Sequence, residues 1–211
     1  MDLIAPEVVR HLDTLVPPRA AELSAMEAEA ARTDFPIIGP ACGHLCYLIA
    51  RLSGARRVFE LGSGFGYSTA WFARAVVENG GGTVFHVVWD ADLSTRARRH
   101  LHALGFAGTI EYRVGEAVKT LRQTDGPFDL IFNDIDKETY PASLPVIEEK
   151  LRPGGVLIVD NLLWSGRIFD PSDTSSRTTG VRELTRLVFE SPRWTASLIP
   201  IRDGLLVARR A

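Results

Sequence analysis

The sequence has only two cysteines, no long hydrophobic run and no excess of charge of either sign. Cys42 and Cys46 lie four residues apart on an expected helix. This spacing gives little support to a disulfide and makes a poor zinc site, so we interpret them as reduced packing residues of a cytoplasmic protein. No apolar run approaches the roughly 20 residues that cross a bilayer. The first residues also lack the basic stretch and apolar core of a signal peptide. We therefore expect no membrane partner.

The charge is nearly balanced, with 24 basic and 26 acidic residues and a formal net charge of −2. This balance argues against nonspecific electrostatic binding to nucleic acid. One short basic run, at Arg96, Arg98, Arg99 and His100, is interpreted as the solvated face of a helix. A chain of 211 residues, of which 45% are hydrophobic, is long enough for one domain with a sizeable core.

Two stretches in the middle of the chain are apolar runs that stop at carboxylates. They are residues 128–137, FDLIFNDIDK, and residues 156–161, VLIVDN. Such runs are expected where buried parallel strands reach their carboxyl edge, and in open α/β sheets that edge is where ligands bind. The two strand tips would bring Asp134 close to Asp160 and Asn161, with Lys137 beside them.

Three hard oxygen ligands of this kind suit Mg²⁺ or Ca²⁺, and a lysine beside such an ion is a candidate base. As an alternative, Asp134 and Asp136 would only cap the helix that follows, and Asp160-Asn161 would only turn the chain. Two strand tips with the same chemistry and a nearby lysine favour the metal site.

The chain around these stretches alternates strands and helices. Strands are expected at residues 57–61, 83–89, 109–113, 128–133 and 156–159, and helices at residues 67–77, 93–104, 116–122 and 140–151. Repeated units of this kind imply an α/β fold with a doubly wound, mostly parallel sheet.

The C-terminal part departs from this alternation of strands and helices. The polar segment 165–179 is expected to be an irregular loop with a functional role, followed by a helix at 181–189. Residues 194–201 and 205–209 flank a short turn at 202–204 and predict a hairpin. The sheet of about seven strands would thus acquire an antiparallel C-terminal edge.

The N-terminal part precedes the alternation. Its expected elements are a helical segment at 6–31 with a break at Pro17-Pro18, a loop at 32–39 and a helix at 40–52. No linker or repeat divides the chain. We therefore predict a single domain over residues 1–211, with residues 1–39 as a helical N-terminal extension.

A glycine-rich turn, Gly62-Ser63-Gly64-Phe65-Gly66, follows the first expected strand. Glycines let a backbone turn tightly and approach a ligand closely. A dinucleotide fingerprint needs Gly-x-Gly-x-x-Gly, and residue 67 is tyrosine, so the motif alone is weak and a simple strand-to-helix turn would look the same. Glu60, inside the strand, is harder to explain, because a buried carboxylate needs partners. A ligand amine or a loop amide would supply them.

With these segments the chain resembles the class I, S-adenosylmethionine-dependent O-methyltransferases of the metal-dependent catechol and caffeoyl-CoA type. The matching segments are residues 58–68, 128–140, 151–167 and 201–210, within a resemblance that covers roughly residues 35–210. The middle two segments are specific, whereas the glycine segment is shared by many other methyltransferases. The resemblance implies a Rossmann-like fold, S-adenosyl-L-methionine as cofactor, a divalent metal (Mg²⁺ first, Ca²⁺ or Mn²⁺ as alternatives) and a homodimer.

The resemblance also implies roles for single residues. Those implied to contact the cofactor are Glu60, Gly62, Ser63, Ser68, Glu116, Ala117 and Asp134. Of these, Glu60, Gly62 and Ser68 would hold the methionine part, and the turn at Gly115-Glu116-Ala117 would contact the adenine. The metal ligands would be Asp134, Asp160 and Asn161. Lys137 would be the catalytic base, and Trp164 with the loop after it would border the acceptor pocket.

One position departs from the family pattern. The family usually has an acid at the end of the second strand that holds the ribose hydroxyls, and here that position is Val88. Asp90, two residues on, would take over the contact if the strand register shifts. Otherwise the contact is lost, which costs on the order of 1.5–3 kcal/mol, or roughly 10- to 150-fold in cofactor affinity.

The expected function is metal-assisted methyl transfer to a hydroxyl of a catechol-like aromatic diol. A tRNA hydroxyuridine methyltransferase is the alternative within the broader family, and the slightly acidic balance of the chain disfavours it. The hypothesis of a non-catalytic protein with a degenerate cofactor site is supported by Val88 alone. A nicotinamide dehydrogenase is disfavoured by Tyr67 and by the missing acid after the second strand.

Overall fold

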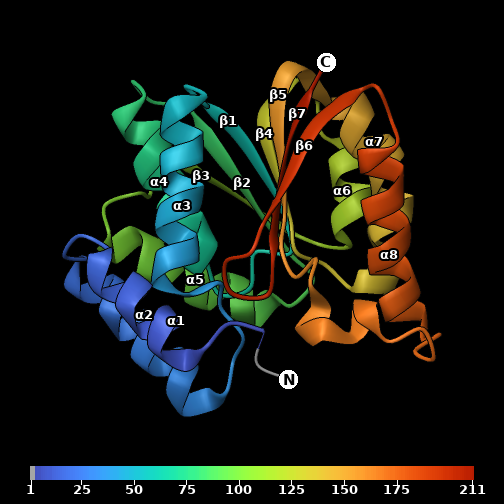
Figure 1. Cartoon of the computed structure of the whole chain (residues 1–211). Helices are drawn as coiled ribbons and strands as arrows, with labels where there is room; N and C mark the ends of the chain where they lie inside the picture. The colour runs from blue at the N-terminus through green and yellow to red at the C-terminus, as the bar shows by residue number, and fades with distance from the viewer. Residues whose placement is uncertain (1–2) are drawn as a thin grey trace.

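The computed structural model describes residues 3–211 and contains one seven-stranded sheet between two layers of helices (Figure 1). The strands are β1 (Arg57–Leu61), β2 (Thr83–Val88), β3 (Ile110–Val114), β4 (Phe128–Asn133), β5 (Leu151–Val159), β6 (Trp194–Ile199) and β7 (Leu205–Arg210). They lie in the order β3-β2-β1-β4-β5-β7-β6. The first five are parallel, and β7 pairs antiparallel with both β5 and β6. The predicted α/β fold, with its antiparallel C-terminal hairpin, is confirmed.

Helices cover both faces of the sheet. They are α1 (Pro6–Leu15), α2 (Ala21–Thr33), α3 (Gly39–Leu52), α4 (Tyr67–Glu78), α5 (Ala91–Ala103), α6 (Ala117–Gln123), α7 (Tyr140–Lys150) and α8 (Ser176–Phe189). Two short 3₁₀ segments, Lys137–Thr139 and Trp164–Phe169, follow β4 and β5. Figure 1 shows α3, α4 and α5 on one side of the sheet and α6, α7 and α8 on the other, with α1 and α2 beside the edge where the parallel strands end.

The central strands β1, β2, β4 and β5 are largely apolar because both faces of the sheet are buried there. Along β1, the side chain of Val58 packs with the core on the α3–α4 side, whereas those of Phe59 and Leu61 pack with the core under α7 and α8. Among residues 3–211, no helix is long and apolar enough to span a membrane. Cys42 and Cys46 are buried and unbonded, as expected of packing residues.

The prediction of an irregular segment at 165–179 is wrong at both of its ends. A 3₁₀ segment occupies Trp164–Phe169, and α8 begins at Ser176 rather than at residue 181. The early start has a local cause, because the Ser175 side chain caps the helix by accepting a hydrogen bond from the Thr178 amide. Because many other residues of the segment are also polar, the sequence does not distinguish this serine as a helix cap.

The basic run on α5 is solvated only in part, because Arg98 and Arg99 are exposed whereas Arg96 is half-buried and His100 is buried. The Nδ1 atom of His100, which is almost fully buried, lies 2.6 Å from Oε1 of Glu22. Arg96 donates to Glu29 over 2.8 Å, and the Arg98 guanidinium lies 4.1 Å from the centre of the Tyr112 ring. The first two contacts join α5 to α2, so part of the run fastens the N-terminal helices to the domain.

Candidate active site

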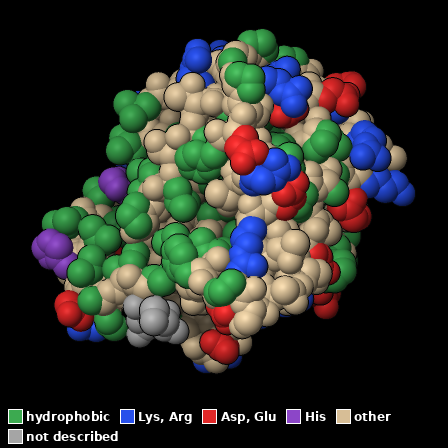
Figure 2. All heavy atoms as spheres, turned by 45° about the vertical axis from the view of Figure 1, so that its right-hand side comes forward, with side chains coloured by type: hydrophobic (Ala, Val, Ile, Leu, Met, Phe, Trp, Pro, Cys, Tyr) green, Lys and Arg blue, Asp and Glu red, His purple; other side chains and the backbone are tan. Residues whose placement is uncertain are grey.

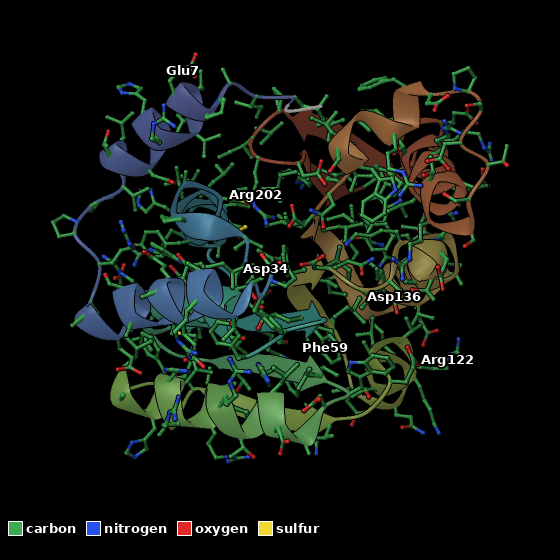
Figure 3. The ribbon with its side chains drawn as sticks, turned by 90° about the horizontal axis from the view of Figure 1, so that it is seen from below. Glu7, Asp34, Phe59, Arg122, Asp136 and Arg202 are labelled. Atoms are coloured by element: carbon green, nitrogen blue, oxygen red, sulfur yellow. The ribbon has the colours of Figure 1, made fainter. Side chains whose placement is uncertain are left out.

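A cavity of about 660 Å³ opens at the edge where the parallel strands end. Figure 3 views this edge from below and shows Asp34 after α2, Asp136 after β4 and Arg202 between β6 and β7 arranged around it. The lining residues come from the α2–α3 connection, the glycine turn, the end of β2, the turn before α6, and the segments after β4 and β5. Segments far apart in the sequence therefore share one cavity.

The glycine turn forms one wall, and its shape requires glycine at Gly62. This residue has a φ of +87°, and a Cβ there would lie 2.3 Å from the carbonyl oxygen of Asp134. Ser63 fastens the turn to β2, because its amide donates to the Val87 carbonyl and its hydroxyl accepts from the Val87 amide, each over 2.9 Å. The cavity wall thus has bare backbone where a ligand can approach closely.

Glu60 lies behind this wall, fully buried and not among the residues that line the cavity. Its oxygens accept hydrogen bonds from Ser68, over 2.5 Å, and from Thr69. Burial raises the pKa of Glu60 to about 7, against the effect of these hydroxyl donors. Two hydroxyls at the start of α4 therefore supply partners that the buried carboxylate needs. Ser68 itself does line the cavity.

The end of β2 presents an apolar surface to the cavity. Val88 and Trp89 line it, and Asp90 does not. Instead Asp90 caps α5, accepting hydrogen bonds from the amides of Asp92 and Leu93 over 2.8 and 2.9 Å. Val88 is the last residue of β2 and pairs with Val114 of β3, whereas Asp90 lies beyond the strand. The carboxylate nearest in sequence to Val88 is therefore engaged elsewhere.

The turn before α6 completes this end of the cavity. Gly115, Glu116 and Ala117 all line it, and the adenine contact that the resemblance implies for them stays a prediction. The Glu116 carboxylate caps α6 by accepting from the amides of Val118 and Lys119 over 2.8 and 2.6 Å. Both acids near this end thus serve as helix caps.

The opposite end of the cavity is charged. Asp134 follows β4 directly, and Lys137 donates from Nζ to its Oδ1 over 2.7 Å. The same Nζ donates to the Tyr140 hydroxyl over 2.9 Å, and that hydroxyl donates to the Asp160 carbonyl over 2.9 Å. Burial raises the pKa of Tyr140 well above its ordinary value, so the phenol stays neutral. The chain of contacts fixes the Lys137 ammonium beside the cavity.

Asp160 lies opposite Asp134, at the end of β5, with only 1% of its surface exposed. Its Oδ1 accepts from the Asn161 amide over 2.9 Å, and its Oδ2 accepts from Arg202 Nη1 over 3.2 Å. Burial and the negative charge of Asp134 raise the pKa of Asp160 to about 7, against the effect of Arg202. The two carboxylates therefore act on each other across the cavity.

These residues supply the donor set that a hard divalent cation prefers. Asp134, Asp160 and Asn161 all line the cavity, and carboxylate and amide oxygens suit Mg²⁺, Ca²⁺ and Mn²⁺. Among residues 3–211, no group of three His, Cys, Asp or Glu side chains is placed to hold a metal. The set is thus two carboxylates and one amide, and the repulsion between the carboxylates is a force that a cation would relieve.

The residues that choose the acceptor were expected in the segments 1–39 and 165–179. Phe35, Pro36, Ile37 and Ile38, from the first segment, line the cavity, whereas no residue of the segment 165–179 does. Trp164, directly before that second segment, does line it. Arg202 was assigned only to a hairpin turn. A topological signal for it exists, because Leu206 pairs with Val159, so the turn before β7 must lie where β5 ends.

The sequence was compared with a family model and with curated proteins. Residues 18–211 match a family model described as O-methyltransferase. A catechol O-methyltransferase from Niastella koreensis is 30% identical over 180 residues, which are 81% of this chain and 80% of that protein.

Solved structures are similar over almost the whole chain. An O-methyltransferase from Bacillus cereus in complex with SAH superposes with a TM-score of 0.88 at 28% identity, covering 97% of both chains. The O-methyltransferase TomG from Streptomyces achromogenes, in complex with SAM, gives a TM-score of 0.87 at 29% identity, covering 97% of this chain and 96% of that one.

Proposed function

This chain belongs to the family of S-adenosylmethionine-dependent O-methyltransferases, and on that premise we propose that it methylates a hydroxyl of a catechol-like aromatic diol with the help of a divalent metal. The observation that carries the proposal is the sharing of one cavity by the glycine turn and the charged group of Asp134, Lys137, Asp160 and Asn161. A sulfonium cofactor at the first and a diol at the second would meet within that cavity.

The proposed reaction joins the acceptor oxygen to the methyl carbon of the sulfonium while the carbon–sulfur bond breaks. The sulfur leaves as a neutral thioether, and the hydroxyl proton passes to Nζ of Lys137, which must be neutral to accept it. The contacts of Nζ with Asp134 and Tyr140 hold that nitrogen in place. Holding both reactants in line can supply on the order of 7–11 kcal/mol of the barrier.

Asp134, Asp160 and Asn161 would hold the divalent metal. When bound, the metal would hold an ortho-diol in a fixed orientation and lower the pKa of its hydroxyl. The apolar residues Phe35, Ile37 and Ile38 line the same cavity and are suited to an aromatic ring. We therefore propose that the acceptor is a small aromatic molecule rather than a macromolecule.

The distribution of surface charge supports a small acceptor over tRNA. On the face shown in Figure 2, the described Lys and Arg side chains are interspersed with Asp and Glu. A continuous basic strip, which a nucleic acid would favour, is not formed by the described residues on that face.

A homodimer also remains a proposal, for which α1 offers a surface. None of its residues is buried, and Val8, Val9 and Leu15 are exposed apolar side chains. Sedimentation velocity of the full chain would test the assembly, with a monomer at micromolar concentration contradicting it.

Titration calorimetry followed by a methyl-transfer assay tests the proposed function. S-adenosylmethionine and S-adenosylhomocysteine should both bind, and no binding at millimolar concentration would contradict the cofactor assignment. Transfer to members of a catechol panel should collapse on addition of EDTA and recover with excess Mg²⁺. Asp160→Ala should abolish this transfer while leaving cofactor affinity largely unchanged. Normal transfer by that variant, or by the chelated enzyme, would contradict the metal assignment.

A further inference from the structure

Arg202 is held against Asp160 by a turn that is itself fastened to the end of β5. The amides of Leu162 and Leu163 donate to the carbonyls of Gly204 and Asp203 over 3.0 and 2.8 Å. Ser165 donates from its amide to the Asp203 side chain over 2.6 Å. A Cβ on Gly204 would lie 2.6 Å from Cγ of Leu163, so the two segments are in close contact. These backbone contacts thus hold Arg202 beside Asp160.

The charges at this end of the cavity are balanced by the chain itself. Asp134 is paired with Lys137 over 2.7 Å, and Asp160 with Arg202 over 3.2 Å. An arginine guanidinium does not lose its proton in proteins. Arg202 is therefore a permanent positive charge on one of the two carboxylates that the metal would need.

We infer that Arg202 competes with the divalent metal for Asp160 and thereby keeps the metal affinity of this site low. The inference rests on the metal site of the proposed function. Oδ1 of Asp160 is engaged by the Asn161 amide, so Oδ2 is the oxygen with the exchangeable partner. A cation that binds there displaces the Arg202 guanidinium or stays beside a like charge, and either event opposes binding. About a third of the Arg202 side chain is exposed, which gives the displaced guanidinium a path to water.

Titration of the intact protein with Mn²⁺, with free Mn²⁺ followed by electron paramagnetic resonance, tests the inference without any assay of activity. Arg202→Gln removes the charge, and we expect it to bind Mn²⁺ at least tenfold more tightly than the wild type. Arg202→Lys restores a cation and should return the affinity toward that of the wild type. Arg202→Gly is a second neutral variant that suits the left-handed backbone at this residue, where φ is +50°. It should match the glutamine variant.

A matched control separates a local effect from a change of net charge. Arg152→Gln also removes one arginine from an ion pair, with Asp129 over 2.7 Å, at the opposite edge of the sheet. Its Mn²⁺ affinity should equal that of the wild type. In the Arg202→Gln background, Asp160→Asn should reverse the gain and so locate the ion.

Equal or weaker Mn²⁺ binding by both neutral variants would overturn the inference, as would an equal gain in Arg202→Lys. An absence of Mn²⁺ binding in wild type and variants alike would also overturn it. Failure of the proposed function has a different signature, because a chain that transfers no methyl group to any catechol would still show the Mn²⁺ series described above.

Discussion

Two buried carboxyl groups, Glu60 behind the glycine turn and Asp160 at the charged end of the cavity, have different partners. Glu60 is held by the neutral hydroxyls of Ser68 and Thr69, whereas Asp160 is held by a backbone amide and the charged Arg202. Burial raises the pKa of each to about 7. The Glu60 carboxylate therefore lies out of reach of the cavity, whereas the Asp160 carboxylate lines it and has one partner, Arg202, that a ligand could displace.

The same contrast extends to the two ends of the cavity. At the glycine turn and the end of β2, backbone and the apolar side chains of Val88 and Trp89 face the space, and Asp90 is turned away to cap a helix. At the ends of β4 and β5, four charged groups form two ion pairs. Shape and backbone would dominate binding at the first end, and charge would dominate chemistry at the second.

The largest expected effect is at the charged end. Lys137→Met removes the proposed base, and we expect methyl transfer to fall on the order of 10²- to 10⁴-fold, because a positioned general base contributes about that much. Cofactor affinity measured by calorimetry should not change. Lys119→Met, at an exposed lysine of α6, is the control and should behave as the wild type. Transfer by Lys137→Met within a few-fold of the wild type would assign the proton to another group.

The next effect concerns Glu60 and the pH dependence of stability. Its pKa of about 7 in the fold lies above the ordinary value near 4.5, so the folded state holds the proton more tightly than the unfolded state. Stability from this group is complete below pH 4.5 and is lost as pH rises to about 7. Relative to Glu60→Gln, the free energy of unfolding of the wild type should fall by on the order of 3 kcal/mol between pH 4.5 and about 7.

Urea unfolding at pH 4.5 to 8 measures this difference. The pH dependence that Asp160 adds to the free energy of unfolding is the same in both proteins and therefore cancels. Glu149→Gln, at an exposed glutamate of α7, should leave the profile unchanged. A constant difference between wild type and Glu60→Gln across the pH range would show that Glu60 is ionised in the fold throughout.

A third change tests whether the apolar end of β2 limits cofactor binding. Val88→Glu restores an acid at the position implied to hold the ribose, and we expect S-adenosylmethionine to bind roughly 10- to 150-fold more tightly, as for a charge-assisted hydrogen bond. Val114→Glu is matched to it, since Val114 pairs with Val88 on the next strand and is exposed outside the cavity. Calorimetry in which both variants resemble the wild type would show that the ribose lies elsewhere.

The smallest expected effect is at Asp90. Asp90→Ala removes a helix cap and should cost about 1 kcal/mol of unfolding free energy, with no change in cofactor affinity. Asp90→Asn keeps a capping oxygen and should recover most of the stability. A tenfold or greater loss of S-adenosylmethionine affinity in Asp90→Ala would mean that Asp90, despite its cap, replaces the missing acid.

Local patterns were sufficient for most of the framework. The bounds of β1 and β4 were predicted to the residue, because both are apolar runs with clear breaks on either side. The start of α8 was missed, since a capping serine in a polar segment gives little contrast with its neighbours. The partners of Glu60 were also missed, although Ser68 and Thr69 come only one residue after the glycine turn.

The order of strands and helices, the acids at the tips of β4 and β5, and the resemblance to the family follow from the amino-acid sequence, because all three depend on residues close together in the chain. The roles of the proposed ligands and of Lys137 stay predictions. The folded structure was needed to show that Asp90 caps α5 outside the cavity, which residues of the N-terminal segment line the cavity (35–38), and that Arg202 pairs with Asp160 across 42 positions. Such contacts arise from the packing of distant segments at one sheet edge, and no local pattern specifies which side chain meets which.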